Sequence, residues 1–170
     1  QENRDVVVAV IDTGVDILHP DLRDSIWTND DEIPGDGIDN DGNGYVDDYF
    51  GWDFFYNDPS VFSMGSSEDT HGTHVAGTIA AGRNNGGVAG ITGSDHVKIM
   101  VLKALGTSQG MGSPEDVVAA IQYAEANGAS ICNLSFCSNA YSQELADAIE
   151  NSNMLFVVAA GNGDENGVGL

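Results

Sequence analysis

Four short apolar runs are spaced along the chain, and each is continuous rather than alternating with polar residues. They are Val6–Ile11, Val97–Leu102, Ser130–Leu134 and Met154–Ala159. Continuous apolar runs of this length are typical of strands that are covered on both faces of a sheet. The pattern therefore predicts four buried strands.

Two segments between these runs have the apolar spacing of helices. Ser113 and Pro114 provide an N-cap and a first helical residue, apolar positions follow through Ala124, and Gly128 marks the end. A second helix is predicted from Gln143 to Asn151. Strands that alternate with helices in this way predict an α/β fold, a doubly wound and mostly parallel sheet flanked by helices.

The segment 28–58 departs from this pattern and forms an acidic insert. Asp30 to Asp48 holds eight acidic residues in nineteen, and no Lys or Arg lies between Asp24 and Gly82. The insert is too polar for a core, and its glycines predict a loop. Its acidic groups must repel one another or hold a cation.

The spacing of oxygen side chains in the insert favours calcium. Side chains at positions 1, 3, 5 and 9 of an EF-type loop, with a backbone carbonyl at position 7, bind calcium in a flexible geometry. These positions are occupied by Asp39, Asp41, Asn43, Asp47 and, for the carbonyl, Tyr45. Position 12 is Phe50, so Asp48 is the expected substitute for the usual glutamate. A purely solvated acidic loop is the alternative.

Composition limits the classes of partner. The 170 residues suffice for one domain, and 41% of them are hydrophobic, so the chain is expected to fold. Because 27 acidic residues face 5 basic ones, the net charge is −22, and nucleic acid and anionic membranes are excluded as partners. No apolar run approaches the roughly 20 residues that span a bilayer. The first residues do not resemble a signal peptide, and both Cys132 and Cys137 are expected as free thiols, Cys132 buried.

Three polar residues stand where strand ends or helix starts could bring them together. Asp12 ends the first predicted strand, His71 begins a glycine-rich helical run, and Asn162 follows the last strand. An aspartate at the carboxyl end of a parallel strand is well placed for function, His71 could meet it there, and the Asn162 amide could donate to an oxyanion. Each has a simpler alternative, because a turn aspartate, a structural histidine and a Gly-Asn-Gly turn are common.

Two other chemistries are less well supported. Asp-Thr-Gly occurs in aspartic proteases, but those need a second such motif and are rich in β-structure. His71 and His74 share a helix face, but no HExxH motif or nearby cysteine supports zinc.

Taken together, the motifs resemble the subtilisin-like serine protease family (subtilases, peptidase S8). The blocks are VAVIDTGVD around Asp12, HGTHVAGTIAA around His71, NLS ending at Ser135 and VVAAGN ending at Asn162. The resemblance covers nearly the whole chain and implies a peptide or protein substrate. It implies that Asp12 orients His71, that His71 is the general base, and that Asn162 stabilises the oxyanion.

The resemblance also assigns the substrate-binding segments. Gly110, Met111 and Gly112 match the edge along which family members bind the substrate backbone, and Ser135, Phe136 and Cys137 match the wall of the main specificity pocket. A bulky residue at Gly112 is expected to block the groove and leave the fold intact. His74 resembles a second family histidine, which we assign to structural packing.

The nucleophile block Gly-Thr-Ser-x-Ala does not occur in residues 1–170. We therefore expect residues 1–170 to be the N-terminal part of a subtilisin-like catalytic domain, truncated relative to the family, and inactive alone. The remaining C-terminal part of that domain, or a prodomain, is the expected protein partner. The alternative is a non-catalytic fragment or pseudoprotease that binds a peptide or partner chain.

A second calcium site follows from the same resemblance, and the expected location follows from calcium binding. Asp21 and Asn84 match residues of a calcium site that is common in the family. Because a weak calcium site is filled at extracellular calcium concentrations, we expect the protein to be secreted or extracellular.

Overall fold

The computed structural model describes residues 5–83, 87–93, 96–138 and 140–163. Its described part contains a five-stranded sheet in the order β2-β3-β1-β4-β5, in which every paired strand is parallel to its neighbour. The strands are β1 (Val6–Asp12), β2 (Gly51–Asp53), β3 (Val97–Lys103), β4 (Ile131–Leu134) and β5 (Leu155–Val158). The predicted α/β fold with a parallel sheet is confirmed.

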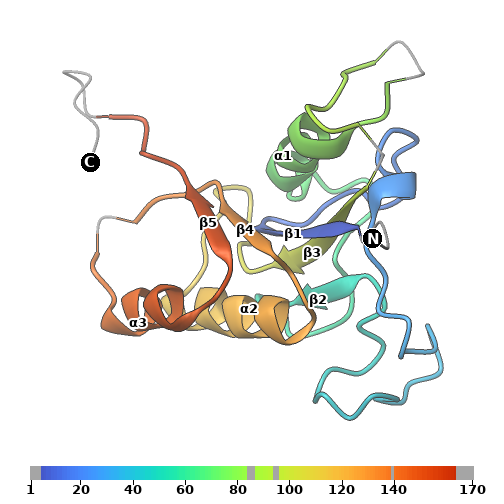
Figure 1. The fold of residues 1–170 in the computed structure, drawn as a ribbon, viewed down its shortest axis with the longest axis horizontal. Coiled ribbons are helices and arrows are strands. Elements are labelled where there is room, and N and C mark those ends of the chain that lie inside the picture. Colours follow the sequence, from blue (N-terminus) through green and yellow to red (C-terminus); the bar gives the residue numbers. More distant parts are fainter. Residues whose placement is uncertain (1–4, 84–86, 94–95, 139, 164–170) are drawn as a thin grey trace.

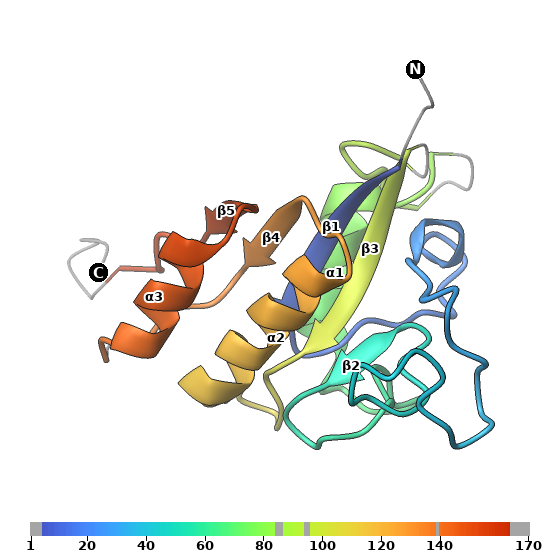
Figure 2. The ribbon, with the colours of Figure 1, turned by 60° about the horizontal axis from the view of Figure 1, so that its bottom comes forward.

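Helices cover both faces of the sheet. Figure 1 shows α1 (Thr70–Ala80) on one side and α2 (Pro114–Ala126) with α3 (Gln143–Asn151) on the other. A short 3-10 helix, η1 (Arg23–Ser25), precedes β2. In the turned view of Figure 2, α1 lies behind β1 and β3.

The alternation of side chains along β1 divides the core into two layers. Val8 and Val10 pack with Ala76 of α1, whereas Ala9 and Ile11 pack with residues of α2 and β4. Because both faces of the central strands are covered, their sequences are continuously apolar, as the pattern predicts.

The helix starts agree with the sequence. Pro114 is the first residue of α2, and the Ser113 hydroxyl accepts a hydrogen bond of 3.1 Å from the N–H of Asp116. Ser142 caps α3 in the same way, through the N–H of Leu145. These bonds satisfy donors that a helix start otherwise leaves unpaired.

The acidic insert is not entirely a loop. Its residues Gly51–Asp53 form β2, which pairs with the end of β3, and the Trp52 and Phe54 side chains are buried in the core. The prediction of a loop through 28–58 is therefore wrong at its end, because three strand residues are too few to give a periodic signal.

The expectation for the two cysteines is confirmed. Cys132 and Cys137 are both free, and Cys132 is fully buried, which raises the pKa of its thiol to about 12. Within the described residues, no helix has the length and apolar content needed to cross a membrane.

Candidate active site

The structure brings Asp12 and His71 together at the carboxyl edge of the sheet. Asp12 is the last residue of β1 and is fully buried, and His71 is the second residue of α1. The distance between His71 Nδ1 and Asp12 Oδ1 is 2.7 Å, and the His71 side chain is 56% exposed. A proton on Nδ1 would be held by the carboxylate, which leaves Nε2 as a proton acceptor.

The backbone around this pair is held by short polar contacts between β1 and α1. The Thr13 hydroxyl accepts a hydrogen bond of 3.1 Å from the N–H of Gly72, and Asp12 Oδ1 also accepts one from the N–H of Thr13. Asp12 Oδ2 is buried and has no hydrogen-bond partner among the described residues. The orientation of the carboxylate is therefore fixed through one oxygen.

A hollow of about 420 Å³ lies beside His71. Its lining joins His71 to several residues that the family resemblance assigns to substrate binding, namely Gly110, Ser135, Phe136 and Cys137. Three separate segments of the chain thus meet at one cavity that an imidazole also faces.

Four of the predicted catalytic and substrate-binding residues do not line this hollow, and one of them is the fully buried Asp12. Met111 is 59% exposed beside it and pairs with Gly106 in a small antiparallel bridge. Gly112 follows Met111, and Asn162 lies exposed on the coil after β5.

The expectation that a bulky residue at Gly112 leaves the fold intact is wrong. A Cβ atom there would collide with the Ala104 carbonyl oxygen and would lie 2.6 Å from Leu105 Cδ2. Close backbone approach requires glycine at this position, so a side chain would displace the segment.

The predicted calcium residues separate into groups. Carboxylate oxygens of Asp39, Asp41 and Glu32 lie within 4.8 Å of one another. Glu32 is only 4% exposed, and its Oε2 has no hydrogen-bond partner within the described residues. Sequence reasoning did not select Glu32, because it precedes the EF-type spacing.

The other predicted ligands make different contacts. Asp47 accepts hydrogen bonds from the N–H groups of residues 35–37, and Asp48 is fully buried and accepts a bond of 2.6 Å from the Tyr123 hydroxyl. The amide of Asn43 donates to both Asp41 and Asp48. Tyr45 packs its ring against Trp52.

Backbone amides stabilise the charged form of one candidate ligand. Hydrogen bonds from the N–H groups of Gly44, Gly42 and Asn43 hold the pKa of Asp39 below its usual value. Asp39 is therefore ionised and available to a cation at neutral pH.

The hydroxyl that binds Asp48 keeps its proton. Burial and the bond to Asp48 raise the pKa of Tyr123.

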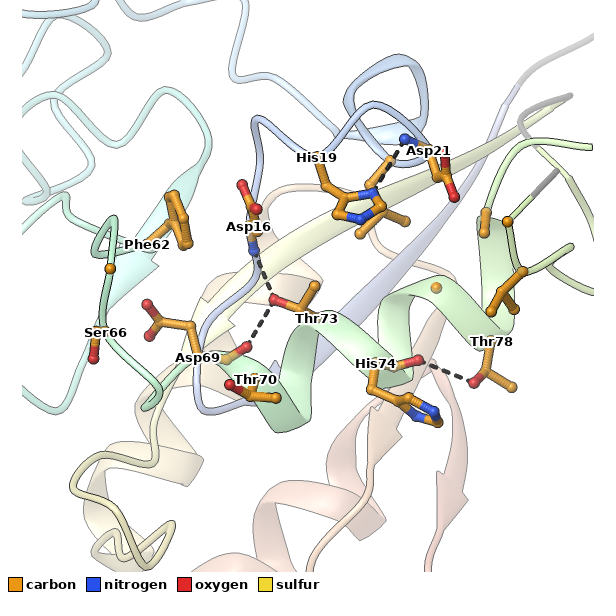
Figure 3. A pocket seen from close by; sticks show the side chains of 16 residues that line it. Asp16, His19, Asp21, Phe62, Ser66, Asp69, Thr70, Thr73, His74 and Thr78 are labelled. Atoms are coloured by element: carbon orange, nitrogen blue, oxygen red, sulfur yellow. Dashed lines mark hydrogen bonds between the residues drawn. The ribbon is translucent and has the colours of Figure 1, made fainter. Parts of the chain in front are cut away.

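A larger hollow of about 660 Å³ follows another face of α1 (Figure 3). It is lined by Thr73, His74 and Asp21, and His71 is not part of it. His74 is exposed there, so its assignment to structural packing is wrong. Asn84, the predicted partner of Asp21 in a second calcium site, lies outside the described residues.

A buried cluster beside the histidine was not expected from the sequence. Lys103, 1% exposed at the end of β3, lies 3.0 Å from Asp69, 3.2 Å from Glu68 and 3.7 Å from Asp53. Burial alone lowers the pKa of Lys103, but its carboxylate partners raise it above the usual value. Burial raises the pKa of Asp53 to about 6. No local pattern signals this cluster, because its members come from three separate segments.

Comparison with known proteins identifies the family of the chain. The profile of the subtilase family, peptidase S8, matches residues 3–169, so the chain belongs to the subtilase family. It is 38% identical over 160 residues to subtilisin-like protease 1 of Plasmodium vivax, covering 91% of this chain and 24% of that protein. It is 34% identical to the major intracellular serine protease of Bacillus subtilis (strain 168), covering 96% of this chain and 46% of that protein.

Solved structures show the same fold. Fervidolysin from Fervidobacterium pennivorans, a keratinolytic enzyme related to subtilisin, matches with a TM-score of 0.69 and 26% identity, over 95% of this chain and 22% of that one. A cold-adapted subtilisin-like serine proteinase matches with a TM-score of 0.63 and 25% identity, over 95% of this chain and 48% of that one. The chain spans less than half the length of each of these relatives.

Proposed function

We propose that this chain supplies the acid and the general base of a subtilisin-like serine endopeptidase. The observation that carries the proposal is the 2.7 Å contact between buried Asp12 and exposed His71, at a hollow that Gly110 and Ser135 also line. A buried carboxylate that holds an imidazole at the mouth of a groove is the arrangement that activates a serine hydroxyl.

Each residue has a distinct role in the proposed reaction. Asp12 keeps the proton on Nδ1 of His71 and stabilises the imidazolium that forms. His71 takes the proton of the attacking serine and returns it to the leaving amine. Asn162 follows β5 at the same edge of the parallel sheet as Asp12, and its amide would donate to the oxyanion. The serine would come from a Gly-Thr-Ser-x-Ala block, which residues 1–170 do not contain.

The test uses a protein that includes this block. His71→Ala should lower kcat by about 10⁴-fold or more, and adding Asp12→Ala should cost little further, because the two residues act as a unit. His74→Ala, an exposed histidine on the same helix, is the matched control and should retain activity. Unchanged peptide cleavage by His71→Ala would refute the proposal.

Residues 1–170 alone should neither cleave peptides nor react with a serine-directed fluorophosphonate. Labelling of one of their own serines would show that the assignment of the nucleophile is wrong. A longer protein that binds a peptide in the groove without cleaving it would identify a pseudoprotease, which is the alternative function.

A calcium ion bound by the acidic insert is a further part of the proposal. The donor set fits the ion, because hard carboxylate oxygens of Glu32, Asp39 and Asp41 converge and one buried Glu32 oxygen has no partner in the part of the chain that the structure describes. A cation there would offset the repulsion among these charges and satisfy the orphaned oxygen. Asp48, which shares the amide of Asn43 with Asp41, would support the site from behind.

The proposed location is outside the cell, where calcium concentrations keep a weak site filled. The proposal rests on the acidic insert alone, and the relative from B. subtilis is named an intracellular protease. Fractionation of the producing cells, with the protein detected in the medium or in the cell extract, tests it directly.

The proposed protein partner covers β5. This edge strand exposes Leu155 by 63%, Val157 by 51% and Val158 by 56%. Further residues of the same catalytic domain, or a prodomain, would remove this apolar surface and the unpaired strand edge from water. Hydrogen exchange at residues 155–158 in a longer protein, compared with residues 1–170, should show added protection.

A further inference from the structure

Glu68 lies three residues before His71 and contacts the segment that leads to the proposed substrate edge. One of its oxygens, Oε1, accepts hydrogen bonds from the N–H of Thr107 and from the Tyr56 hydroxyl, the latter at 3.0 Å. The other, Oε2, accepts a hydrogen bond of 3.2 Å from Lys103 Nζ. Both oxygens therefore bind protein groups, and the Glu68 side chain is only 15% exposed.

Lys103 fixes Glu68 from the side of the sheet. Its ammonium group is 1% exposed and also contacts Asp69, the residue before α1, at 3.0 Å. Lys103 is the register partner of Asp12 across the β1–β3 pair. Because a buried ammonium group is stable only when it is paired, the cluster resists displacement of any single member.

Thr107 begins the turn that carries Gly110. Its backbone has a φ of 63°, and its carbonyl accepts a hydrogen bond of 3.2 Å from the N–H of Gly110. Gly106 and Met111 exchange two backbone hydrogen bonds, of 2.7 and 2.8 Å, and close a small hairpin. The bond from Thr107 to Glu68 therefore ties this hairpin to the start of the helix that holds His71.

We infer that Glu68 is a positioning residue that holds the hairpin 106–111 in register with His71. This inference rests on the proposed function, because the register matters only if a peptide lies along the segment 110–112. An extended peptide bound there reaches the general base at the correct distance only while the hairpin is held. A small substrate that contacts only the groove at His71 does not depend on it.

The test compares two substrates in a protein that includes the nucleophile block. One is an extended peptide with at least four residues before the scissile bond, and the other is an ester of a single amino acid. Glu68→Ala should raise KM for the extended peptide by about tenfold, the scale of one hydrogen bond to a charged group, with its kcat and the ester kinetics within about twofold. Glu144→Ala on α3 is the control and should leave the kinetics of both substrates unchanged, because Glu144 is exposed and accepts a hydrogen bond from Ser142, the cap residue of its own helix.

Glu68→Gln separates the tether from the charge. Its amide oxygen can still accept from Thr107, so KM for the extended peptide should lie between those of wild type and Glu68→Ala. Hydrogen exchange supplies a readout independent of activity: Glu68→Ala should accelerate exchange at residues 107–111 and leave the interior of β3 protected. If Glu68→Ala does not fold, the exchange and KM of Glu68→Gln decide the question.

The outcomes distinguish this inference from the function on which it rests. Equal changes on both substrates, or unchanged kinetics and exchange in an active protein, would overturn the role of Glu68 alone. A wild-type protein that cleaves neither substrate would instead refute the proposed peptidase activity, and the role in catalysis would fall with it. Faster exchange in Glu68→Ala together with a selective rise in KM supports the inference.

Discussion

Most acidic residues of this chain are at least partly exposed, but a few carboxylates are buried and contact particular partners. Among the described residues, those under 5% exposed are Asp12, Glu32, Asp48, Asp53 and Asp69. Asp12 contacts the imidazole of His71, and Glu32 has one oxygen without a partner among the described residues. Asp48 accepts a hydrogen bond from the Tyr123 hydroxyl, and Asp53 and Asp69 both lie beside the ammonium group of Lys103. Because an unpaired buried charge is costly, these partners indicate where the acidic residues are used.

The proposed calcium site predicts a specific response to chelation. Calcium at 100 times its Kd should stabilise the fold by about 2.7 kcal/mol, since it binds the folded loop alone. Glu32→Gln and Asp41→Ala should each reduce the loss of Tm that a chelator causes in wild type. Asp31→Asn, an exposed neighbour outside the carboxylate group, is the control and should behave as wild type. Equal chelator-induced losses in all four proteins would show that the site lies elsewhere.

The raised pKa of Asp53 predicts a pH dependence of stability. Burial raises this pKa to about 6, above the unfolded value of 3.8. The folded state therefore holds a proton that the unfolded state releases, so this stabilising term is complete below pH 4 and is lost as pH rises to 6. Asp53→Asn removes the titration and keeps an acceptor for the N–H of Tyr56.

The stability of Asp53→Asn relative to wild type should rise by about 2 kcal/mol between pH 4 and pH 7. Denaturant unfolding of both proteins across this range measures the difference. A constant difference would show that Asp53 does not titrate there.

The individual residues differ in how visible they are in the sequence. Asp12 and His71 were predicted because each sits in a local motif next to a strand end or a helix start. Glu68 and Lys103 were not predicted, because their role depends on segments that meet only in the folded chain. Glu32 was not predicted, because it precedes the EF-type spacing. Long-range charge pairing leaves no periodic trace along the chain.

At the scale of elements, the approach of α1 to β1 positions His71. A Cβ atom on Gly72 would collide with the Gly14 carbonyl oxygen and lie 3.2 Å from Asp12 Cβ. The helix can approach the strand this closely only because Gly72 has no side chain. The 2.7 Å contact between His71 and Asp12 depends on that approach.

Two glycines of α1 therefore make a matched pair for mutation. Gly72→Ala should destabilise the fold by about 1–3 kcal/mol through overpacking and should separate His71 from Asp12. Gly77→Ala, where a Cβ atom meets nothing within 4 Å, should stabilise the helix by about 0.5–1 kcal/mol. Denaturant unfolding and the NMR shift of the His71 Nδ1 proton measure the two effects. A neutral Gly72→Ala variant would contradict the close approach.

The predictability of the elements follows their length and burial. The four longer strands and two helices lie within a few residues of their predicted ranges, because apolar runs and caps are local signals. The predicted burial of the fourth of these strands is wrong, because β5 lies at the edge of the sheet and exposes more than half of Leu155, Val157 and Val158. β2 was missed because its three residues lie within the acidic insert and their burial depends on pairing with β3.

At the scale of the whole molecule, a net charge of −22 opposes compact folding. Raising NaCl from about 10 mM to 300 mM without divalent ions should raise Tm, by about 2–4 °C for each kcal/mol of repulsion that is screened. Near pH 4.1, the sequence pI, the same salt increase should have little effect. Equal salt effects at both pH values would show that charge repulsion does not limit stability.

The register of β1 has a consequence for synthesis on the ribosome. Val6 pairs with Val97 and Val8 with Ile131, so within the described residues the sheet partners of β1 are made much later than β1 itself. Until Lys103 has left the exit tunnel, the apolar segment 6–12 stays without the neighbour that gives it a place in the sheet. Slowing translation before residue 97 should therefore increase aggregation of the nascent chain, and holding chaperones should reduce it.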